Sequence, residues 1–251
     1  MTFDEEMKQR GWAVFEDYLD ADLIEWMRVE LAEAYELCRS VQIRNGIENA
    51  EHTVHHLVGQ GRSWLELLRS MPNDFIEEFF GGPYILNSLG GNINPPSASN
   101  YAGKVHRDIR SFFVERVMLN AIVLLDDFTQ ENGATWLMTG THRLKDIPNG
   151  ESFELDEHQI VAPVGSVILF DSRVWHRAGV NRSGGPRRIV TPMYTKPFYK
   201  PQFDYCRALG DDILTMSSTL QQILGYNARI PATLDEWYRV PEKRCYRPNQ
   251  G

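Results

Sequence analysis

Residues 117–126 read Val-Met-Leu-Asn-Ala-Ile-Val-Leu-Leu-Asp, an almost continuously apolar run bounded by polar residues. A short apolar run of this kind predicts a β-strand buried in the protein interior, with Asn120 as its polar exception. A turn signal, Gln-Glu-Asn-Gly, follows at residues 130–133, and residues 134–138 have the composition of a further strand. Residues 117–138 are therefore predicted to form a β-hairpin.

Further strands are predicted on both sides of this run. Residues 84–89 precede it, and residues 164–170 and 187–194 follow it, the last of these after a Gly-Gly-Pro turn. Residues 90–102, rich in Gly, Asn, Pro and Ser, predict a long irregular segment. Long loops of this kind in compact domains are often functional.

Helical patterns lie outside the strands. After a short predicted strand at residues 11–15, Asp20 is expected to begin a helix that carries apolar residues at helical spacing. Residues 63–71 and 74–80 predict two more helices, and the helical pattern returns from residue 202 to residue 238.

The order of helices, about eight strands and helices again predicts an α+β fold. We expect a double-stranded β-helix, that is, a jelly-roll or cupin-like barrel, braced by N- and C-terminal helices. The chain has 251 residues, which suits a single domain over residues 1–251 with the jelly-roll core at about residues 84–200. A ligand pocket is expected in the mouth of such a barrel.

Composition limits the class of partner. The chain is 42% hydrophobic and 24% charged, as in ordinary globular proteins, and no apolar run reaches the length needed to span a membrane. The net charge of −8 argues against a dominant attraction to nucleic acid or to an anionic membrane, so a small-molecule substrate is the expected partner. The oligomeric state is unknown, because no heptad or apolar stripe indicates an interface.

Two further features bear on location and redox chemistry. The acidic N-terminus does not resemble an export signal, so a cytoplasmic location is the default expectation. The three cysteines, Cys38, Cys206 and Cys245, are widely spaced and form no CxxC pair, which indicates neither a disulfide framework nor a thiolate zinc site.

The tetrapeptide Val-His-Arg-Asp at residues 105–108 carries the chemical signal. On a strand the side chains of His106 and Asp108 would leave the same face, and His176 is the best candidate for a third ligand. Two histidines and one carboxylate on one face of a metal leave other positions open, as in non-haem Fe(II) oxygenases. The HxD spacing alone is a weak signal.

Arg187 lies eleven residues after His176, at the start of a predicted strand. A guanidinium can hold a carboxylate by two parallel hydrogen bonds, which suits a dicarboxylate cosubstrate that chelates iron at its other end. Arg188 is the adjacent competitor. Successive strand residues face opposite sides, so only one of the two arginines can enter the barrel.

The combination of motifs resembles the phytanoyl-CoA dioxygenase (PhyH)-like family of Fe(II)/2-oxoglutarate-dependent oxygenases. The matching motifs span most of the chain and occur in the same order as in the family. The motifs that carry it are Gly11-Trp12-Ala13-Val14-Phe15-Glu16-Asp17, His106-Arg107-Asp108, Leu119-Asn120-Ala121, Glu131-Asn132-Gly133-Ala134-Thr135, Gly140-Thr141-His142-Arg143, Gly165-Ser166-Val167, and His176 with Asn181 and Arg187.

The resemblance implies that His106, Asp108 and His176 ligate Fe(II) and that Arg187 pairs with the far carboxylate of 2-oxoglutarate. Asn120 and Thr135 lie on the strands expected to flank the cosubstrate, where each is either a hydrogen-bond donor to it or an ordinary core polar group satisfied locally.

The reaction implied consumes O2 and 2-oxoglutarate, releases succinate and CO2, and removes a hydrogen from the substrate. Related halogenases lack the ligand carboxylate, so Asp108 favours hydroxylation of an unactivated C–H bond, while desaturation, ring formation and epimerisation stay open.

The other histidines are not expected to bind the metal. His52, His55 and His56 are expected to be surface or pocket-lining residues in a loop, residues 43–60, that reaches the site, because their spacing does not suit a closed metal site. The resemblance places His142 outside the metal site.

The substrate is expected to be a free secondary metabolite, selected by the loops at residues 43–60 and 90–104. The expected contacts to it are Asn92, Asn94, Tyr101 and Arg110. A CoA ester is less favoured, because its phosphates would need a dedicated basic patch. The alternatives are a non-catalytic metal- or ligand-binding jelly-roll protein and a cupin-type metalloenzyme that does not use 2-oxoglutarate.

Overall fold

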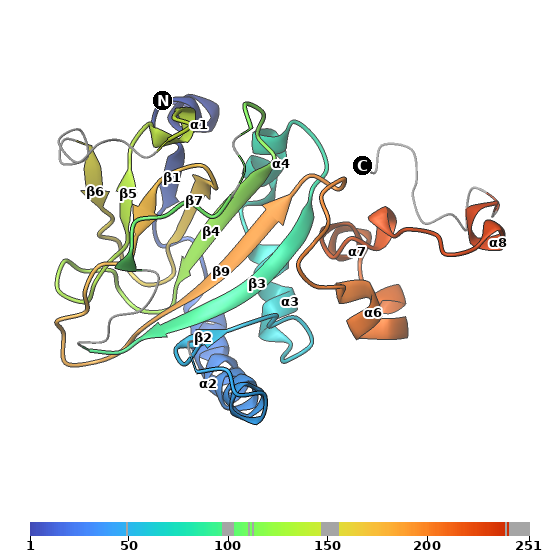
Figure 1. Ribbon diagram of the computed structural model, residues 1–251, viewed down its shortest axis with the longest axis horizontal. Helices are drawn as coiled ribbons and strands as arrows, with labels where there is room; N and C mark the ends of the chain where they lie inside the picture. Colours follow the sequence, from blue (N-terminus) through green and yellow to red (C-terminus); the bar gives the residue numbers. More distant parts are fainter. Residues whose placement is uncertain are drawn as a thin grey trace.

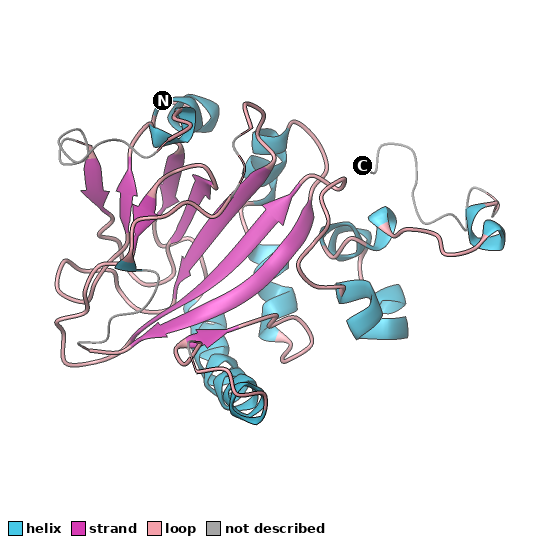
Figure 2. Cartoon of the chain, viewed as in Figure 1, coloured by secondary structure: helices cyan, strands magenta, loops and turns pink. Residues whose placement is uncertain are grey.

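The computed structural model describes residues 1–48, 50–96, 103–109, 111, 113–146, 156–238 and 240. In these residues the β-structure consists of a six-stranded and a three-stranded sheet, both antiparallel (Figures 1 and 2). The large sheet has the order β1 (Trp12–Phe15), β7 (Val167–Asp171), β4 (Met118–Leu124), β9 (Arg187–Thr195), β3 (Ile85–Asn94) and β2 (Thr53–Val54). The small sheet has the order β6 (Glu157–Gln159), β5 (Trp136–Met138) and β8 (His176–Arg177).

Helices flank the large sheet. Helices α2 and α3 lie behind the sheet in the view of Figure 1, and α6 to α8 lie to one side of it. No helix within the described ranges has both the length and the apolar character needed to cross a bilayer. The helices before the strands are α1 (Phe3–Gln9), α2 (Ala21–Arg44), α3 (Ser63–Ser70) and α4 (Asn73–Phe80), and the later ones are η2 (Thr141–Arg143), α6 (Tyr205–Leu209), η3 (Gly210–Thr215), α7 (Ser218–Ile223), η4 (Tyr226–Ala228) and α8 (Leu234–Trp237).

Local sequence explains where these helices begin and end. The Asp20 carboxylate accepts a hydrogen bond of 2.8 Å from the Asp22 amide and caps the N-terminus of α2, as expected for an aspartate at this position. Gly81 ends α4 with a φ of 68°, a left-handed conformation that glycine adopts without a steric cost.

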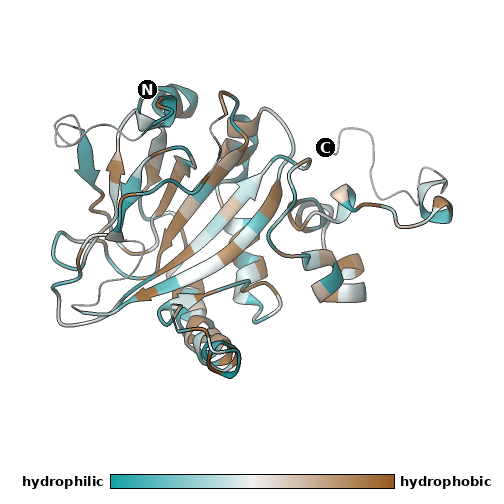
Figure 3. Cartoon of the chain, viewed as in Figure 1, coloured by the Kyte–Doolittle hydropathy of each residue, from teal (hydrophilic) through white to brown (hydrophobic). Residues whose placement is uncertain are grey.

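Strand β4 is buried on both faces, which explains its continuous apolar sequence. Leu119, Ala121 and Val123 pack into the core between the large sheet and the helices, whereas Ile122 and Leu124 pack into a second core between the two sheets. Strand β7 alternates in the same way, and Figure 3 shows the apolar colouring of these central strands. The predicted buried strand is confirmed.

The mixed fold of antiparallel sheets and helices is confirmed, but two details of the prediction are wrong. Residues 117–138 do not form a hairpin, because β4 pairs with β7 and β9 while β5 pairs with β6 and β8 in the other sheet. Residues 90–94 are not irregular but continue β3, where pairing with β9 satisfies their backbone. The pairing of the described strands does not close the two sheets into one barrel.

The C-terminal helical region is divided more finely than predicted. Instead of a continuous pattern, short α- and 3₁₀-helices alternate, with a left-handed glycine at Gly225 between α7 and η4. Gly210, also at positive φ, is the C-cap of α6 and the first residue of η3.

Glu30 joins α2 to the N-terminus of α3. Its buried carboxylate accepts hydrogen bonds of 3.0 Å from the backbone amides of Arg62 and Ser63, and a third bond from the Ser63 hydroxyl. Arg62, at the N-cap position of α3, makes no side-chain capping bond, so Glu30 satisfies amides that the helix itself leaves without partners.

We therefore expect Glu30→Ala to lower the free energy of unfolding by about 2 kcal/mol, because it leaves buried donors without an acceptor. Urea denaturation followed by circular dichroism measures the change. Glu33→Ala, at an exposed position of the same helix, should change stability by less than about 0.5 kcal/mol. Equal losses in the two variants would contradict the capping role.

Candidate functional site

His106 and His176 are held together through their backbones. The His106 amide donates to the His176 carbonyl at 2.9 Å, and the His176 amide donates to the His106 carbonyl at 2.8 Å. The two imidazole rings lie 4.3 Å apart between centroids. Residue 106 thus forms an isolated bridge beside β8, not the regular strand expected for the HxD motif.

Both imidazoles are fixed in the tautomer that suits metal binding. Nδ1 of His106 lies 2.7 Å from the Lys104 carbonyl, and Nδ1 of His176 lies 3.0 Å from the Val174 carbonyl. A carbonyl only accepts hydrogen bonds, so each Nδ1 donates and each Nε2 keeps its lone pair. Burial lowers the pKa of His176, which favours its neutral form.

Asp108 completes a three-residue group. Its two carboxylate oxygens lie 3.7 Å from Nε2 of His106 and 3.6 Å from Nε2 of His176. One ligand atom from each of the three residues lies within 4.8 Å of the others, so the group could hold a metal ion.

Two polar residues orient the Asp108 carboxylate. The Asn120 side-chain amide, from β4, donates to Oδ2 of Asp108. The Ser172 hydroxyl donates to the Asn120 carbonyl oxygen at 2.6 Å, which fixes the amide with its NH2 group toward Asp108. Asn120 is therefore already engaged with the candidate metal-ligating carboxylate.

Arg187 is a buried cation on β9, with 1% of its surface exposed. Its Nη1 donates to the Gly133 carbonyl, its guanidinium lies 4.8 Å from the centre of the Phe128 ring, and its Nε has no partner. Burial lowers its pKa to about 10, so the side chain stays charged at neutral pH. No described carboxylate forms an ion pair with it.

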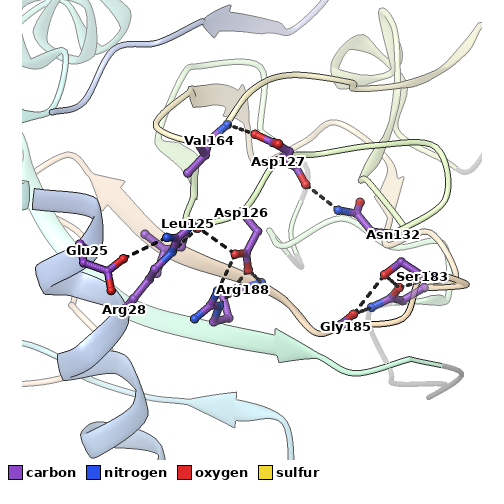
Figure 4. A network of polar contacts seen from close by, with 11 residues as sticks. Glu25, Arg28, Leu125, Asp126, Asp127, Asn132, Val164, Ser183, Gly185 and Arg188 are labelled. Atoms are coloured by element: carbon purple, nitrogen blue, oxygen red, sulfur yellow. Dashed lines mark hydrogen bonds and ion pairs between the residues drawn. The ribbon is translucent and has the colours of Figure 1, made fainter. Parts of the chain in front are cut away.

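Arg188 faces the other side of β9, as strand alternation predicts. Its guanidinium donates to both oxygens of Asp126 at 2.9 and 2.6 Å, and Arg28 of α2 pairs with the same carboxylate at 3.3 Å (Figure 4). The Arg188 charge is thus neutralised away from the site.

One cavity brings the predicted residues together. It has a volume of about 420 Å³. All six residues predicted to form the site line it, namely His106, Asp108, His176, Arg187, Asn120 and Thr135. Phe170, whose ring meets that of His176 edge-on at 4.9 Å, contributes apolar lining with Ile122 and Ile189.

The loop residues predicted to reach the site differ in their positions. His55, His56 and Asn92 line the cavity, whereas His52 and Asn94 are not among its described lining residues. The Asn94 carbonyl instead accepts a hydrogen bond of 2.8 Å from the Asn181 side chain. Tyr101 and Arg110 lie outside the described residues.

His142 is buried away from the cavity, as the resemblance implied. Its ring packs against the backbone of Gly11 so closely that a side chain at residue 11 would collide with it. Burial lowers its pKa to about 4.

The residues that support the site carry no recognisable sequence motif. Ser172 orients Asn120, and Phe128 covers the Arg187 guanidinium. Asp171 and Arg173 form a buried ion pair with an N–O distance of 2.6 Å, and Arg173 also donates to the carbonyls of residues 113 and 114. The sequence Asp-Ser-Arg directly after an apolar strand was the available signal, but its partners lie elsewhere in the chain.

Comparison with known proteins identifies the family. Residues 7–189 match the family described as phytanoyl-CoA dioxygenase (PhyH). The chain belongs to this family. The resemblance found in the sequence motifs is thereby confirmed.

Individual relatives share at most moderate sequence identity with this chain over the matched regions. The uncharacterized protein Rv1501 of Mycobacterium tuberculosis is 38% identical over 134 residues, which make up 53% of this chain and 49% of that protein. The dioxygenase af480 of Aspergillus fumigatus is 25% identical over 160 residues, 60% of this chain and 50% of that protein. The chain thus spans about half the length of these curated relatives.

Two solved structures share the fold. AviO1 from Streptomyces viridochromogenes superposes with a TM-score of 0.62 at 21% identity, over 78% of this chain and 95% of AviO1. SnoN, described as a non-heme α-ketoglutarate-dependent epimerase from nogalamycin biosynthesis, gives a TM-score of 0.62 at 18% identity, over 79% of this chain and 84% of SnoN. At these identities the likeness concerns the fold alone.

The pKa of His142 predicts how stability changes with pH. In the unfolded chain a histidine binds a proton near pH 6.5, whereas His142 in the folded protein does so only near pH 4. The unfolded state therefore binds more protons between these values, and the stability contributed by neutral His142 is lost as the pH falls through this window, by up to about 3 kcal/mol.

Urea denaturation at several pH values from 7 to 4 should show a shallower pH dependence for His142→Asn than for the wild-type protein. His158→Asn, at an exposed position, serves as the control and should keep the wild-type slope. An unchanged slope in His142→Asn would contradict the prediction.

Proposed function

We propose that this protein is a non-haem Fe(II)- and 2-oxoglutarate-dependent dioxygenase that hydroxylates a C–H bond of a small-molecule secondary metabolite and releases succinate and CO2. Membership of the phytanoyl-CoA dioxygenase family supports the class of enzyme. Relatives named as dioxygenases, and the likeness to SnoN from nogalamycin biosynthesis, support the setting in secondary metabolism.

We also propose that the two sheets correspond to the faces of a double-stranded β-helix. Both sheets contribute residues to the cavity, Asn120 and Arg187 from the large sheet and His176 from the small one. The second hydrophobic core between the sheets supports this arrangement.

His106, Asp108 and His176 would hold the iron. The donor set fits Fe(II), because two imidazole nitrogens and one carboxylate on one face leave further positions open to a keto acid and oxygen. When bound, the metal supplies the site at which oxygen is activated for C–H oxidation. Asp108 also keeps a carboxylate where halogenases have a small residue, which favours hydroxylation over halogenation.

The buried charge of Arg187 is the observation that carries the proposal. A guanidinium at 1% exposure, without a described carboxylate partner, is costly unless an anion compensates it. The far carboxylate of 2-oxoglutarate would supply that anion in the cavity shared with the metal-ligating group. Thr135 lines the same cavity, and its contact with the cosubstrate stays a prediction.

The protein would orient its reactants through fixed groups. Asn120 and Ser172 hold the Asp108 carboxylate, and the carbonyls of Lys104 and Val174 hold the imidazoles. The apolar side chains of Phe170, Ile122 and Ile189 exclude water from the region around the reacting C–H bond.

An anaerobic titration of the metal-free protein with Fe(II) and 2-oxoglutarate tests the proposal. We expect the visible metal-to-ligand charge-transfer band of a chelated keto acid. In Arg187→Ala the concentration of 2-oxoglutarate that gives half of this band should rise by about 10- to 100-fold, because a charge-assisted, bidentate contact is lost.

Arg188→Ala is the matched control, since it removes the neighbouring arginine that pairs with Asp126 outside the cavity, and it should keep the wild-type affinity. His176→Ala and Asp108→Ala should give neither the band nor conversion of 2-oxoglutarate to succinate. Absence of the band in folded, iron-loaded wild-type protein would favour a binding protein or a cupin-type enzyme instead.

Removal of the Ser172 hydroxyl should weaken iron binding. Ser172→Ala frees the Asn120 amide to rotate and loosens the Asp108 carboxylate, and residues that orient metal ligands typically contribute about 10- to 100-fold in metal affinity. Competition with a chromophoric chelator measures the Fe(II) affinity. Ser40→Ala, an exposed serine on α2, should leave it unchanged, and an equal affinity in Ser172→Ala would exclude the orienting role.

A further inference from the structure

The cavity extends beyond the groups assigned to iron and 2-oxoglutarate. Its outer part is formed by β3, by the far end of β9 and by the segment around β2. In this part Ser88 pairs with Met193 and Gly90 pairs with Thr191 across the two strands. Gly90 carries no side chain on the cavity wall, and a Cβ atom at this position would lie 3.0 Å from the Val54 carbonyl oxygen and 3.4 Å from the Thr191 hydroxyl.

Four hydrogen-bonding side chains line this outer part, and we call them the outer subsite. They are Ser88, Thr191, Gln202 and His56. Within the described parts of the chain, none of these four side chains forms a hydrogen bond with protein; Ser88, Thr191 and His56 are half-buried and Gln202 is exposed. Convergent polar groups without internal partners are what orient a bound small molecule.

The outer subsite carries no formal charge. Among the described lining residues the charged side chains are Asp108 and Arg187, which are committed to iron and 2-oxoglutarate in the proposed function. Partial burial and the neighbouring His55 lower the pKa of His56, which keeps its imidazole neutral at neutral pH. A ligand with a carboxylate, a phosphate or an ammonium group would find no opposite charge here.

His56 is held rigidly in place. Its φ of 54° lies in the left-handed region, which is uncommon for a residue other than glycine and occurs often at ligand sites. Its ring stacks on Phe203 with centroids 4.3 Å apart and an interplanar angle of 17°, and the Gln60 amide donates to its carbonyl at 2.9 Å. The ring is therefore preorganised before any ligand binds.

We propose that the outer subsite binds an uncharged part of the substrate that carries several hydroxyl or carbonyl oxygens. This inference rests on the proposed function for its assignment as the substrate subsite. Hydroxyl groups of such a ligand would donate to the His56 imidazole and to the Gln202 amide oxygen, and they would accept from the hydroxyls of Ser88 and Thr191. Each polar side chain of the outer subsite would then have a neutral hydrogen-bond partner on the ligand. Free amino acids, fatty acids and nucleotide esters are disfavoured as occupants.

Saturation-transfer NMR on the full chain, loaded with Zn(II) and excess 2-oxoglutarate to occupy Arg187, tests this inference. The probes are methyl β-D-glucopyranoside, hexanoate, adenosine monophosphate and choline at equal concentrations. We expect transfer to the glucopyranoside and not to the three charged probes.

Two variants remove hydrogen-bonding groups while keeping shape. His56→Phe preserves a ring that stacks on Phe203, and Thr191→Val replaces a hydroxyl by a methyl group. Each should weaken glucopyranoside binding by about three- to tenfold, the usual effect of one neutral hydrogen bond. His158→Phe and Thr215→Val, at exposed positions outside the cavity, are the matched controls and should leave binding unchanged.

The inference is overturned if the glucopyranoside gives no transfer, if its binding is unchanged in both His56→Phe and Thr191→Val, or if a charged probe binds and is weakened by these variants. Failure of the iron and 2-oxoglutarate assignment is read separately, from the absence of the charge-transfer band. If the charge-transfer band is absent but glucopyranoside binding still depends on His56, the outer subsite is supported and only the iron and 2-oxoglutarate assignment fails.

Discussion

The geometry of the site depends on the pair of backbone hydrogen bonds between His106 and His176. His176 lies on β8 and also pairs with Leu137 of β5, so the segment around His106 acts as a further member of the small sheet. Backbone pairing sets the separation of the two imidazoles, and the Nδ1 hydrogen bonds then set the direction of each Nε2 atom. The geometry of the candidate metal-ligating group is thus determined by strand pairing, which would reduce the reorganisation that metal binding requires.

The charged side chains in and near the cavity fall into two groups, those that form an ion pair within the protein and those that do not. The ion pairs Asp171–Arg173 and Arg188–Asp126 are neutralised within the protein and hold segments of the fold together. Arg187 has no such partner among the described residues, and Asp108 faces two imidazoles and an amide in place of a cation. Because burying an unpaired charge is unfavourable, the two unpaired groups in the cavity are the ones available to bind an anion and a metal cation.

Sequence alone predicts the parts of this structure that depend on local pattern. The apolar run that became β4, the opposite directions of Arg187 and Arg188, and the helix cap at Asp20 follow from alternation and capping. The hairpin at residues 117–138 was predicted wrongly, because a turn signal does not determine which strand becomes the partner, and burial of β4 on both faces favoured β7 and β9. Residues 90–94 have the composition of a loop, yet pairing with β9 outweighs their low strand propensity.

The contacts that orient the site could not be predicted, because each joins residues distant in sequence. Asp108, Asn120 and Ser172 come from a loop, from β4 and from the turn after β7. The register of β4 with β7 brings Asn120 beside Ser172, and the hydrogen bond of 3.3 Å from the Ile109 amide to the Ser172 carbonyl brings the Asp108 loop beside both. The two parts of the cavity come from different segments of the chain. The candidate metal ligands lie on β8 and beside β4, whereas the outer subsite lies on β3, on β9 and beside the two-residue edge strand β2. A substitution at Ser88 or Thr191 therefore removes a polar group from the outer subsite without removing a candidate metal ligand or the Asn120 and Ser172 contacts that orient Asp108.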